Sequence, residues 1–237
     1  MDSESSISHQ LRVATQNQHR AAESSDFVEN LLDGSLTLEA YTAYLINLAW
    51  VYEALEEQTS SGAPLPTTQP LWDDRLNRLR ALTDDLTALG VDDFHTQAPT
   101  PQTLAYAEHL RALSGRADVR LVAHHYTRYL GDMSGGQAIG RLVERHYGAT
   151  PEQLNFSRFD EIGDLVRYKQ QYREHLDRLD LMAGQRKLLI DEACRAFDFA
   201  RAMFLDLGVT FAPTGTHQGP ITSTESRANQ AESVTVK

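Results

Sequence analysis

Helical periodicity is the feature that most restricts the fold of this chain. Apolar side chains recur at intervals of three and four residues, which places them on one face of an α-helix. No alternating apolar and polar run with flanking turn residues predicts a strand. We therefore predict an all-α, multi-helix fold. The periodic segments are residues 38–55, 76–89, 104–110, 159–176 and 188–205.

Local signals mark where some of these helices begin and end. Thr100 followed by Pro101 is typical of a helix N-terminus. Gly90 and Gly208 are expected just beyond the C-termini of two helices. We predict one helical domain at residues 6–211, a flexible N-terminus at 1–5 and a disordered polar tail at 212–237, where large apolar residues are almost absent.

Composition excludes several classes of protein. The chain has 237 residues, with 22 Lys and Arg against 33 Asp and Glu, and a formal net charge of −11. An acidic chain is poorly suited to neutralising phosphates, so we predict no nucleic-acid partner. No apolar run approaches the roughly 18 residues of a membrane span. The polar N-terminus and the single cysteine, Cys194, favour a soluble cytoplasmic protein without a membrane anchor.

One segment, residues 120–148, breaks the rules of a helix. Its flanks are helical in pattern, but its centre carries four glycines. Each glycine inside a helix costs about 1 kcal/mol relative to alanine. Two explanations are open. One is a break between two helices or a tight helix–helix contact, and the other is a helix backbone that lies against a large flat ligand. A carboxylate within the patch, Asp132, favours the ligand, because it would be costly in a plain helix contact. The glycines are Gly131, Gly135, Gly136 and Gly140.

A histidine near the N-terminus is the second anomaly. His19 falls on the same face of the first helix as Leu11 and Thr15, which predicts that it faces the core. Glu23 follows one turn later. His19 is either a satisfied core residue or a metal ligand, with Glu23 accepting a hydrogen bond from the other ring nitrogen.

Three cations complete the set of unusual residues. Lys169 and Arg173 lie four residues apart on an otherwise apolar face, and Arg12 lies two turns before His19. The pair is either a solvated edge with buried stems or a receptor for ligand carboxylates. A histidine ligand, a glycine-lined helix and cations together suit haem, a flat iron macrocycle with two propionates.

Several motifs resemble those of the haem oxygenase family, and the resemblance spans about residues 11–207. The segment Tyr126–Gln137, YTRYLGDMSGGQ, is very similar to the family signature, and Ala14–Glu23, ATQNQHRAAE, is similar to its proximal helix. Further matches are YEALEEQ at 52–58, YKQQYREHL at 168–176 and DEACRAF at 191–197. The stretch VAHHYTRYLGDMSGG, with RHYG, is most similar to soluble actinobacterial members.

The resemblance implies a haem sandwiched between a proximal helix and a glycine-rich distal helix. His19 would be the proximal iron ligand, oriented by Glu23. Gly131 and Gly135 would let the distal helix approach the haem, and Asp132 would anchor a distal water network.

The remaining implied roles concern the outer parts of this network and the edge of the haem. Tyr52 and Arg128 resemble outer members of the distal network, and Phe197 resembles a wall of the pocket. The residues that match propionate contacts are Arg12, Tyr126, Lys169 and Arg173.

The resemblance also implies the reaction. Haem b would be both cofactor and substrate, cleaved at the α-meso carbon with O₂ and external electrons to biliverdin, CO and ferrous iron. The electron donor would be a ferredoxin with its reductase or a flavoprotein reductase, and the purpose haem iron acquisition or haem catabolism. A haem carrier or sensor, a di-iron carboxylate protein and a helical interaction protein are the rival classes, although the chain has no Glu-x-x-His pair for di-iron.

Overall fold

The computed structural model describes residues 6–212, and every regular element in that range is helical. The all-α prediction is therefore confirmed. The α-helices are α1 (Ile7–Ala14), α2 (Gln16–Glu23), α3 (Asp26–Asp33), α4 (Leu38–Thr59), α5 (Leu79–Ala88), α6 (Pro101–Arg111), α7 (Val119–His125), α8 (Gln137–Tyr147), α9 (Leu165–Asp177) and α10 (Ala183–Thr210).

Shorter helical turns connect these helices. Two π-helical turns, η6 (Tyr126–Leu130) and η7 (Asp132–Gly136), lie between α7 and α8. The remaining turns are 3₁₀ helices: η2 (Gln69–Leu71), η3 (Asp74–Leu76), η4 (Phe94–Thr96), η5 (Gly115–Ala117), η8 (Pro151–Gln153) and η9 (Asn155–Ser157).

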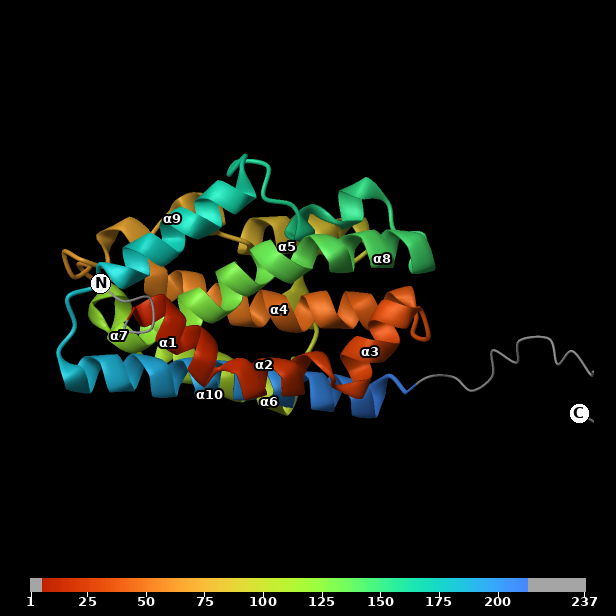
Figure 1. Cartoon of the computed structure of the whole chain (residues 1–237). Helices are drawn as coiled ribbons and strands as arrows, with labels where there is room; N and C mark the ends of the chain where they lie inside the picture. The colour runs from red at the N-terminus through yellow and green to blue at the C-terminus, as the bar shows by residue number, and fades with distance from the viewer. Residues whose placement is uncertain (1–5, 213–237) are drawn as a thin grey trace, which may run out of the picture.

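The central helix of the bundle is α4, which runs through the middle of the molecule (Figure 1). The sequence predicts a single apolar stripe on this helix, but the buried residues occur on all its sides. The reason is that α5, α6, α7, α8 and α10 all contact it. A helix covered on every side is apolar all round, as expected for the core of a larger bundle.

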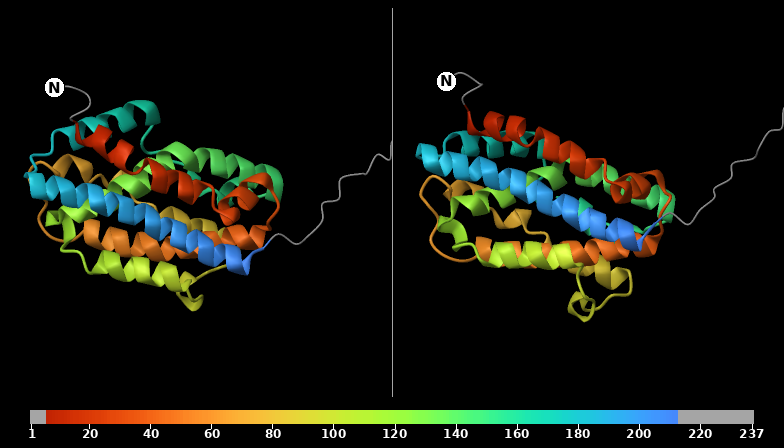
Figure 2. Two further views of the ribbon diagram at one scale, coloured as in Figure 1. Left: turned by 60° about the horizontal axis from the view of Figure 1, so that its bottom comes forward. Right: turned by 90° about the horizontal axis from the view of Figure 1, so that it is seen from below.

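The long helix α10 forms the second axis of the fold (Figure 2). It packs against α1, α2 and α3 on one side and against α6 and α7 on the other. This arrangement places the N-terminal helices next to the chain that follows α7, although more than 100 residues separate them (Figure 1).

The glycine-rich segment is continuous helical backbone from α7 to α8, so it is not a helix break. Its two π-helical turns widen the helix at the position of the glycines. Such turns occur in α-helices mainly as single-turn insertions and often at functional sites. In Figure 1 this segment, coloured green, crosses the molecule diagonally above α4.

Two predicted helix ends are confirmed, and three are wrong. Thr100 caps α6, its side chain accepting a hydrogen bond from the Thr103 N–H, and Gly90 follows α5 with φ of 86°. The helix predicted from residue 76 begins only at Leu79, because Leu76 belongs to the separate turn η3. The helix predicted from residue 159 begins only at Leu165, because Gly163 has φ of 72° and Asp164 caps the first turn. Gly208 lies inside α10 rather than beyond it.

The reason for the glycine at position 208 is packing. A Cβ atom built on Gly208 would lie 3.6 Å from Cβ of Phe27, so α10 and α3 approach closely there. The predictions for residues 1–5 and for the tail concern residues outside the described range, apart from Ala212. Within residues 6–212, no helix is long and apolar enough to cross a membrane.

Candidate functional site

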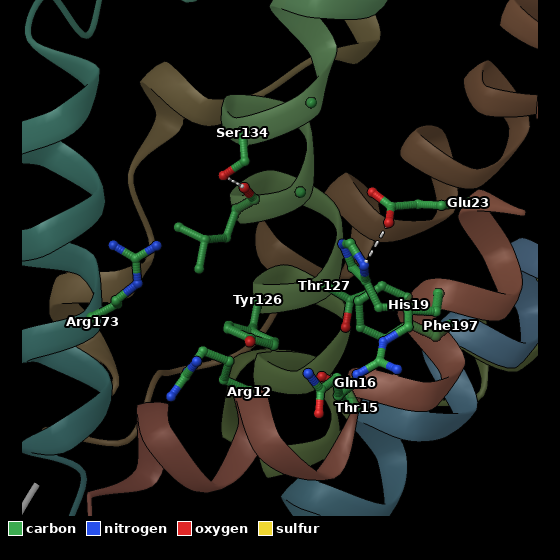
Figure 3. A pocket seen from close by; sticks show the side chains of 14 residues that line it. Arg12, Thr15, Gln16, His19, Glu23, Tyr126, Thr127, Ser134, Arg173 and Phe197 are labelled. Carbon is green, nitrogen blue, oxygen red and sulfur yellow. Dashed lines mark hydrogen bonds and ion pairs between the residues drawn. The ribbon is translucent and has the colours of Figure 1, made fainter. Parts of the chain in front are cut away.

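A cavity of about 470 Å³ opens between the N-terminal helices and the glycine-rich segment (Figure 3). Its volume lies in the range of roughly 300–1,000 Å³ that is typical of ligand pockets. Residues from α1, α2, η6, η7, α9 and α10 line it, and the lining residues are Arg12, Thr15, Gln16, His19, Arg20, Glu23, Tyr126, Thr127, Leu130, Gly131, Ser134, Gly135, Arg173 and Phe197.

His19 projects into this cavity from α2. The junction between α1 and α2 keeps helical hydrogen bonds, since Thr15 N–H donates to the Leu11 carbonyl at 3.0 Å and His19 N–H to the Thr15 carbonyl at 2.9 Å. The predicted face is therefore continuous. The His19 side chain is nevertheless 48% exposed, so the expectation that it faces a packed core is wrong. The cavity interrupts the core at this position.

Glu23 holds one nitrogen of the His19 ring. Nδ1 of His19 lies 3.0 Å from Oε2 of Glu23, one turn along α2, and the ring of Phe197 meets the imidazole edge to face at 5.3 Å. A proton on Nδ1 leaves the lone pair on Nε2, which is the tautomer that a metal ligand requires. The pair thus has the geometry of an imidazole oriented by a carboxylate.

Two glycines form the bare wall of the cavity. Cβ atoms built on Gly131 and Gly135 would meet no other atom within 4 Å. The backbone does not need glycine for its conformation either, since Gly131 has φ of −63° and ψ of −50° and neither residue has a positive φ. Nothing within residues 6–212 therefore accounts for the absence of side chains at these positions.

The other two glycines of the patch have a different cause. A Cβ built on Gly140 would lie 2.4 Å from Oγ and 2.9 Å from Cβ of Ser157, and one on Gly136 would be 4.0 Å from Cα of Ser157. Gly140 therefore allows η9 to pack closely against the helix, whereas a Cβ on Gly136 would make only ordinary van der Waals contact. The tight helix contact that the sequence left open is thus found at Gly140, whereas Gly131 and Gly135 border open space.

Asp132 points away from the cavity into a buried polar network. The Tyr52 hydroxyl donates to Oδ2 of Asp132, and Nη2 of Arg128 lies 3.3 Å from Oδ1. Burial raises the pKa of Asp132 well above its usual range. A proton on this carboxyl therefore persists to higher pH than on an exposed aspartate.

A small enclosed cavity adjoins this network. It measures about 20 Å³, and Asp132, Tyr44 and Gly136 are among the residues that line it. This volume is enough for about one water molecule. Asp132 and the main cavity are thus on opposite sides of one helix, with space for water beside the carboxyl.

The predicted propionate contacts are only partly brought together. Arg12 and Arg173 line the cavity with Tyr126, at the end opposite His19 and Phe197 (Figure 3). Lys169 is not among the lining residues, and its Nζ lies 3.4 Å from the Met133 carbonyl. Of the two cations predicted to bind propionates on α9, only Arg173 lines the cavity.

The sequence analysis missed four polar residues of the lining: Gln16, Arg20, Thr127 and Ser134. Gln16 lies three residues before His19, and Thr127 lies four residues before Gly131, so helical spacing could have found both. Ser134 precedes Gly135 and donates its hydroxyl to the Leu130 carbonyl at 2.7 Å. The buried Oγ1 of Thr127 has no hydrogen-bond partner within the described residues. A buried hydroxyl in that state at a cavity wall suits a bound polar group or water.

Comparisons with known proteins decide the family. The family model described as "Heme oxygenase" matches residues 5–206. A "Heme oxygenase" of Porphyra purpurea is 33% identical over 205 residues, covering 86% of this chain and 87% of the relative.

The chain belongs to the haem oxygenase family.

Solved structures of this family have the same fold. Heme oxygenase-1 from the cyanobacterium Synechocystis in complex with heme matches with a TM-score of 0.81 and 30% identity, covering 86% of this chain and 93% of the other. The heme oxygenase from Leptospira interrogans matches with a TM-score of 0.79 and 30% identity, covering 84% and 98%. The predicted fold, family and oxidative function on haem are thereby confirmed, whereas the likeness to actinobacterial members stays a prediction.

Proposed function

We propose that the cavity binds one haem b and that the chain cleaves it oxidatively to biliverdin, CO and ferrous iron, using O₂ and external electrons. One observation carries the proposal. Gly131 and Gly135 lack side chains although no contact within the described residues requires glycine there. They line the same cavity as His19, whose Nε2 is not engaged by Glu23. A flat iron macrocycle uses both features at once.

The residues of the cavity fit haem by their chemistry. His19 would ligate the iron through Nε2 while Glu23 holds Nδ1–H. Arg12 and Arg173, which are the cations at the far end, would bind the propionates by charge-assisted hydrogen bonds. Phe197 would cover the porphyrin face beside the imidazole. The macrocycle, when bound, supplies the iron centre at which O₂ is reduced and the meso carbons that are oxidised.

Asp132 would act as the source of protons on the distal side. Burial raises the pKa of Asp132, so its carboxyl holds a proton under conditions in which a solvated aspartate has lost it. Because the side chain points away from the main cavity, transfer would run through water rather than by direct contact. Tyr52 and Arg128 fix the carboxyl in this orientation.

The cations would also determine which meso carbon is oxidised. Arg12 and Arg173 would hold the propionates at one end of the cavity and so restrict the orientation in which haem binds. We expect cleavage at the α-meso carbon. Tyr126 lies next to these cations and, since burial raises the pKa of its phenol, it would act as a neutral hydrogen-bond donor. Lys169 would contribute only if it left the Met133 carbonyl.

The electrons would come from a ferredoxin with its reductase or from a flavoprotein reductase, in the cytoplasm. Local basic groups at the cavity rim would attract an acidic donor despite the net charge of −11. The physiological purpose would be haem catabolism or the acquisition of haem iron.

One experiment separates this function from haem carriage or sensing. The purified chain is mixed with one equivalent of haemin, a chemical reductant and air, and the pigment is identified by chromatography. We expect loss of the Soret band and formation of biliverdin with release of CO. A stoichiometric complex whose Soret band persists would indicate a carrier, and absence of a complex would refute haem binding.

A further inference from the structure

Three side chains outside the haem cavity come together where α6, α7 and α10 meet. His109, His124 and Glu192 each come from a different one of these helices. Nε2 of His124 lies 3.0 Å from Oε1 of Glu192, and Nε2 of His109 also contacts Oε1. The His124 and Glu192 side chains are 0% and 4% exposed, and that of His109 is 19% exposed. None of the three lines the haem cavity.

The surrounding contacts orient these groups toward one point. Nδ1 of His124 lies 3.1 Å from the Tyr106 hydroxyl, so its Nε2 is the nitrogen that faces Glu192. The ring of Phe199 stacks on Tyr106 and lies 5.0 Å from the ring of His109. The second carboxylate oxygen, Oε2, is 3.8 Å from Nη1 of Arg195. Oε1 and two imidazole nitrogens thus converge.

We propose that His109, His124 and Glu192 form a binding site for one divalent transition-metal ion, separate from the haem site. Two imidazoles and one carboxylate are the donor set of many zinc sites, with water completing a tetrahedron. The three donor atoms lie within 4.8 Å of one another. Metal bonds of about 2.0–2.1 Å in a tetrahedron require donors about 3.3 Å apart, so the Glu192 carboxylate would have to move away from the two imidazole nitrogens to admit an ion.

The second shell suits a metal. A ligating histidine usually donates its other N–H to a polar partner, and the Tyr106 hydroxyl is in place to accept it from Nδ1 of His124. An ion bound here would replace the protons that the two Nε2 atoms share with Glu192.

Two cations, Arg195 and Arg120, lie near the cluster, and the surroundings weaken the repulsion that each would exert on a metal ion. Arg195 is 59% exposed, so solvent screens it. Arg120, from α7, acts on both His124 and Glu192, but Asp118 holds its Nη2 at 2.6 Å and neutralises most of that charge. The partial exposure of His109 gives an ion and its completing water a way in.

The test uses the full chain, freed of metal with a chelator and without haem. Co²⁺ is the probe, because its visible absorption reports coordination by nitrogen and oxygen in a four-coordinate site, and Zn²⁺ is titrated by calorimetry. We expect one equivalent to bind, with intense Co²⁺ absorption that Zn²⁺ displaces. Fe²⁺, added without oxygen, should compete with Co²⁺ more weakly than Zn²⁺ does.

Variants locate the ion. His109→Gln and Glu192→Gln keep side-chain volume and hydrogen bonding, and each should weaken Co²⁺ binding at least about 100-fold, while Tyr106→Phe should weaken it about 10-fold. His19→Gln, in the haem cavity, and His95→Gln, on the surface, are matched controls that should bind as the wild type does. His109→Gln alters a partly exposed side chain, so it tests the site even if Glu192→Gln fails to fold.

Two results would overturn the proposal. One is no stoichiometric Co²⁺ or Zn²⁺ binding by the wild type, which would leave the cluster as a hydrogen-bonded clamp between three helices. The other is binding that persists in His109→Gln and disappears in His19→Gln, which would assign the ion to the haem cavity. Neither result depends on haem turnover.

Discussion

The helical segment of residues 127–140 has two faces, and the surroundings of its glycines differ between them. On the open face, Gly131 and Gly135 border the cavity and touch nothing. On the closed face, a Cβ on Gly140 would overlap Ser157, and Gly136 lies near the same residue. The same residue type thus borders open space on one side and permits close packing on the other. Only the neighbours of each glycine distinguish the two situations.

The two faces also divide the chemistry. The open face looks toward His19 across the cavity, whereas Asp132 lies on the closed side in contact with Tyr52 and Arg128. If the proposed function is correct, changes facing the cavity should impair haem binding, and changes on the closed side should impair turnover or folding.

The largest effect is expected from His19→Ala, which removes the group opposite the open face. Loss of an outer-shell partner of a metal ligand costs about 10–100-fold, so loss of the ligand itself should lower biliverdin formation at least about 100-fold. Pigment formation with haemin and reductant measures it, and added imidazole should restore part of it. His175→Ala, on α9, is the control. Unchanged turnover without imidazole would remove His19 from the site.

Asp132→Ala tests the closed side. Because this carboxyl is proposed to supply protons without lining the main cavity, haem should still bind, while biliverdin yield falls by about 100-fold or more. Haem titration and product chromatography measure the two quantities separately. We expect reduced oxygen to be diverted to peroxidase-like oxidation of added phenols. A normal biliverdin yield would show that Asp132 is not part of the reaction.

A pair of alanine substitutions compares the faces directly. Gly140→Ala forces a Cβ onto Ser157 and should lower the free energy of unfolding by roughly 1–3 kcal/mol. Gly135→Ala has open space and should raise it by about 0.5–1 kcal/mol, yet weaken haem binding. Urea unfolding and haemin titration are the measurements, and Ser157→Gly should rescue Gly140→Ala. Equal destabilisation by both substitutions would contradict the distinction.

The cations of α9 offer a smaller effect. Arg173→Leu should produce a mixture of biliverdin isomers and weaken haem binding several-fold, since it removes a charge at the cavity. Lys169→Leu should change the mixture less, because Lys169 contacts the Met133 carbonyl instead. Chromatography resolves the isomers. An isomer ratio altered more by Lys169→Leu would reverse the assignment.

The smallest effect concerns stability against pH. Burial raises the pKa of Asp132, so the native state holds this proton to higher pH than the unfolded chain, whose aspartates titrate near pH 4. Asp132 therefore destabilises the native state progressively as the pH rises above about 4. Relative to the wild type, the free energy of unfolding of Asp132→Asn should increase as the pH rises above about 4, and it should not increase below that pH. Urea unfolding from pH 3.5 to 7.5 measures the difference, and a constant difference would contradict the raised pKa.

Much of the site was predictable because its residues are of types that are unusual at those positions of a helix. Glycine in a helical pattern and a histidine with a glutamate one turn later are visible in the sequence, since helical spacing fixes which residues share a face. Spacing cannot distinguish a core from a cavity, which is why His19 was expected to face packed side chains. Spacing also cannot distinguish Lys169 from Arg173. The two residues share a helix face, but Lys169 contacts the Met133 carbonyl and Arg173 lines the cavity.

The sequence alone determined the all-α class, the family and the residues where helix rules fail, because these depend on periodicity and motifs within single segments. Tertiary structure decided which glycines border open space, that Asp132 turns away from the cavity, and that two histidines and a glutamate from three helices meet. Those features depend on contacts between segments that are far apart in the chain, and the distances across them follow only from how the helices pack.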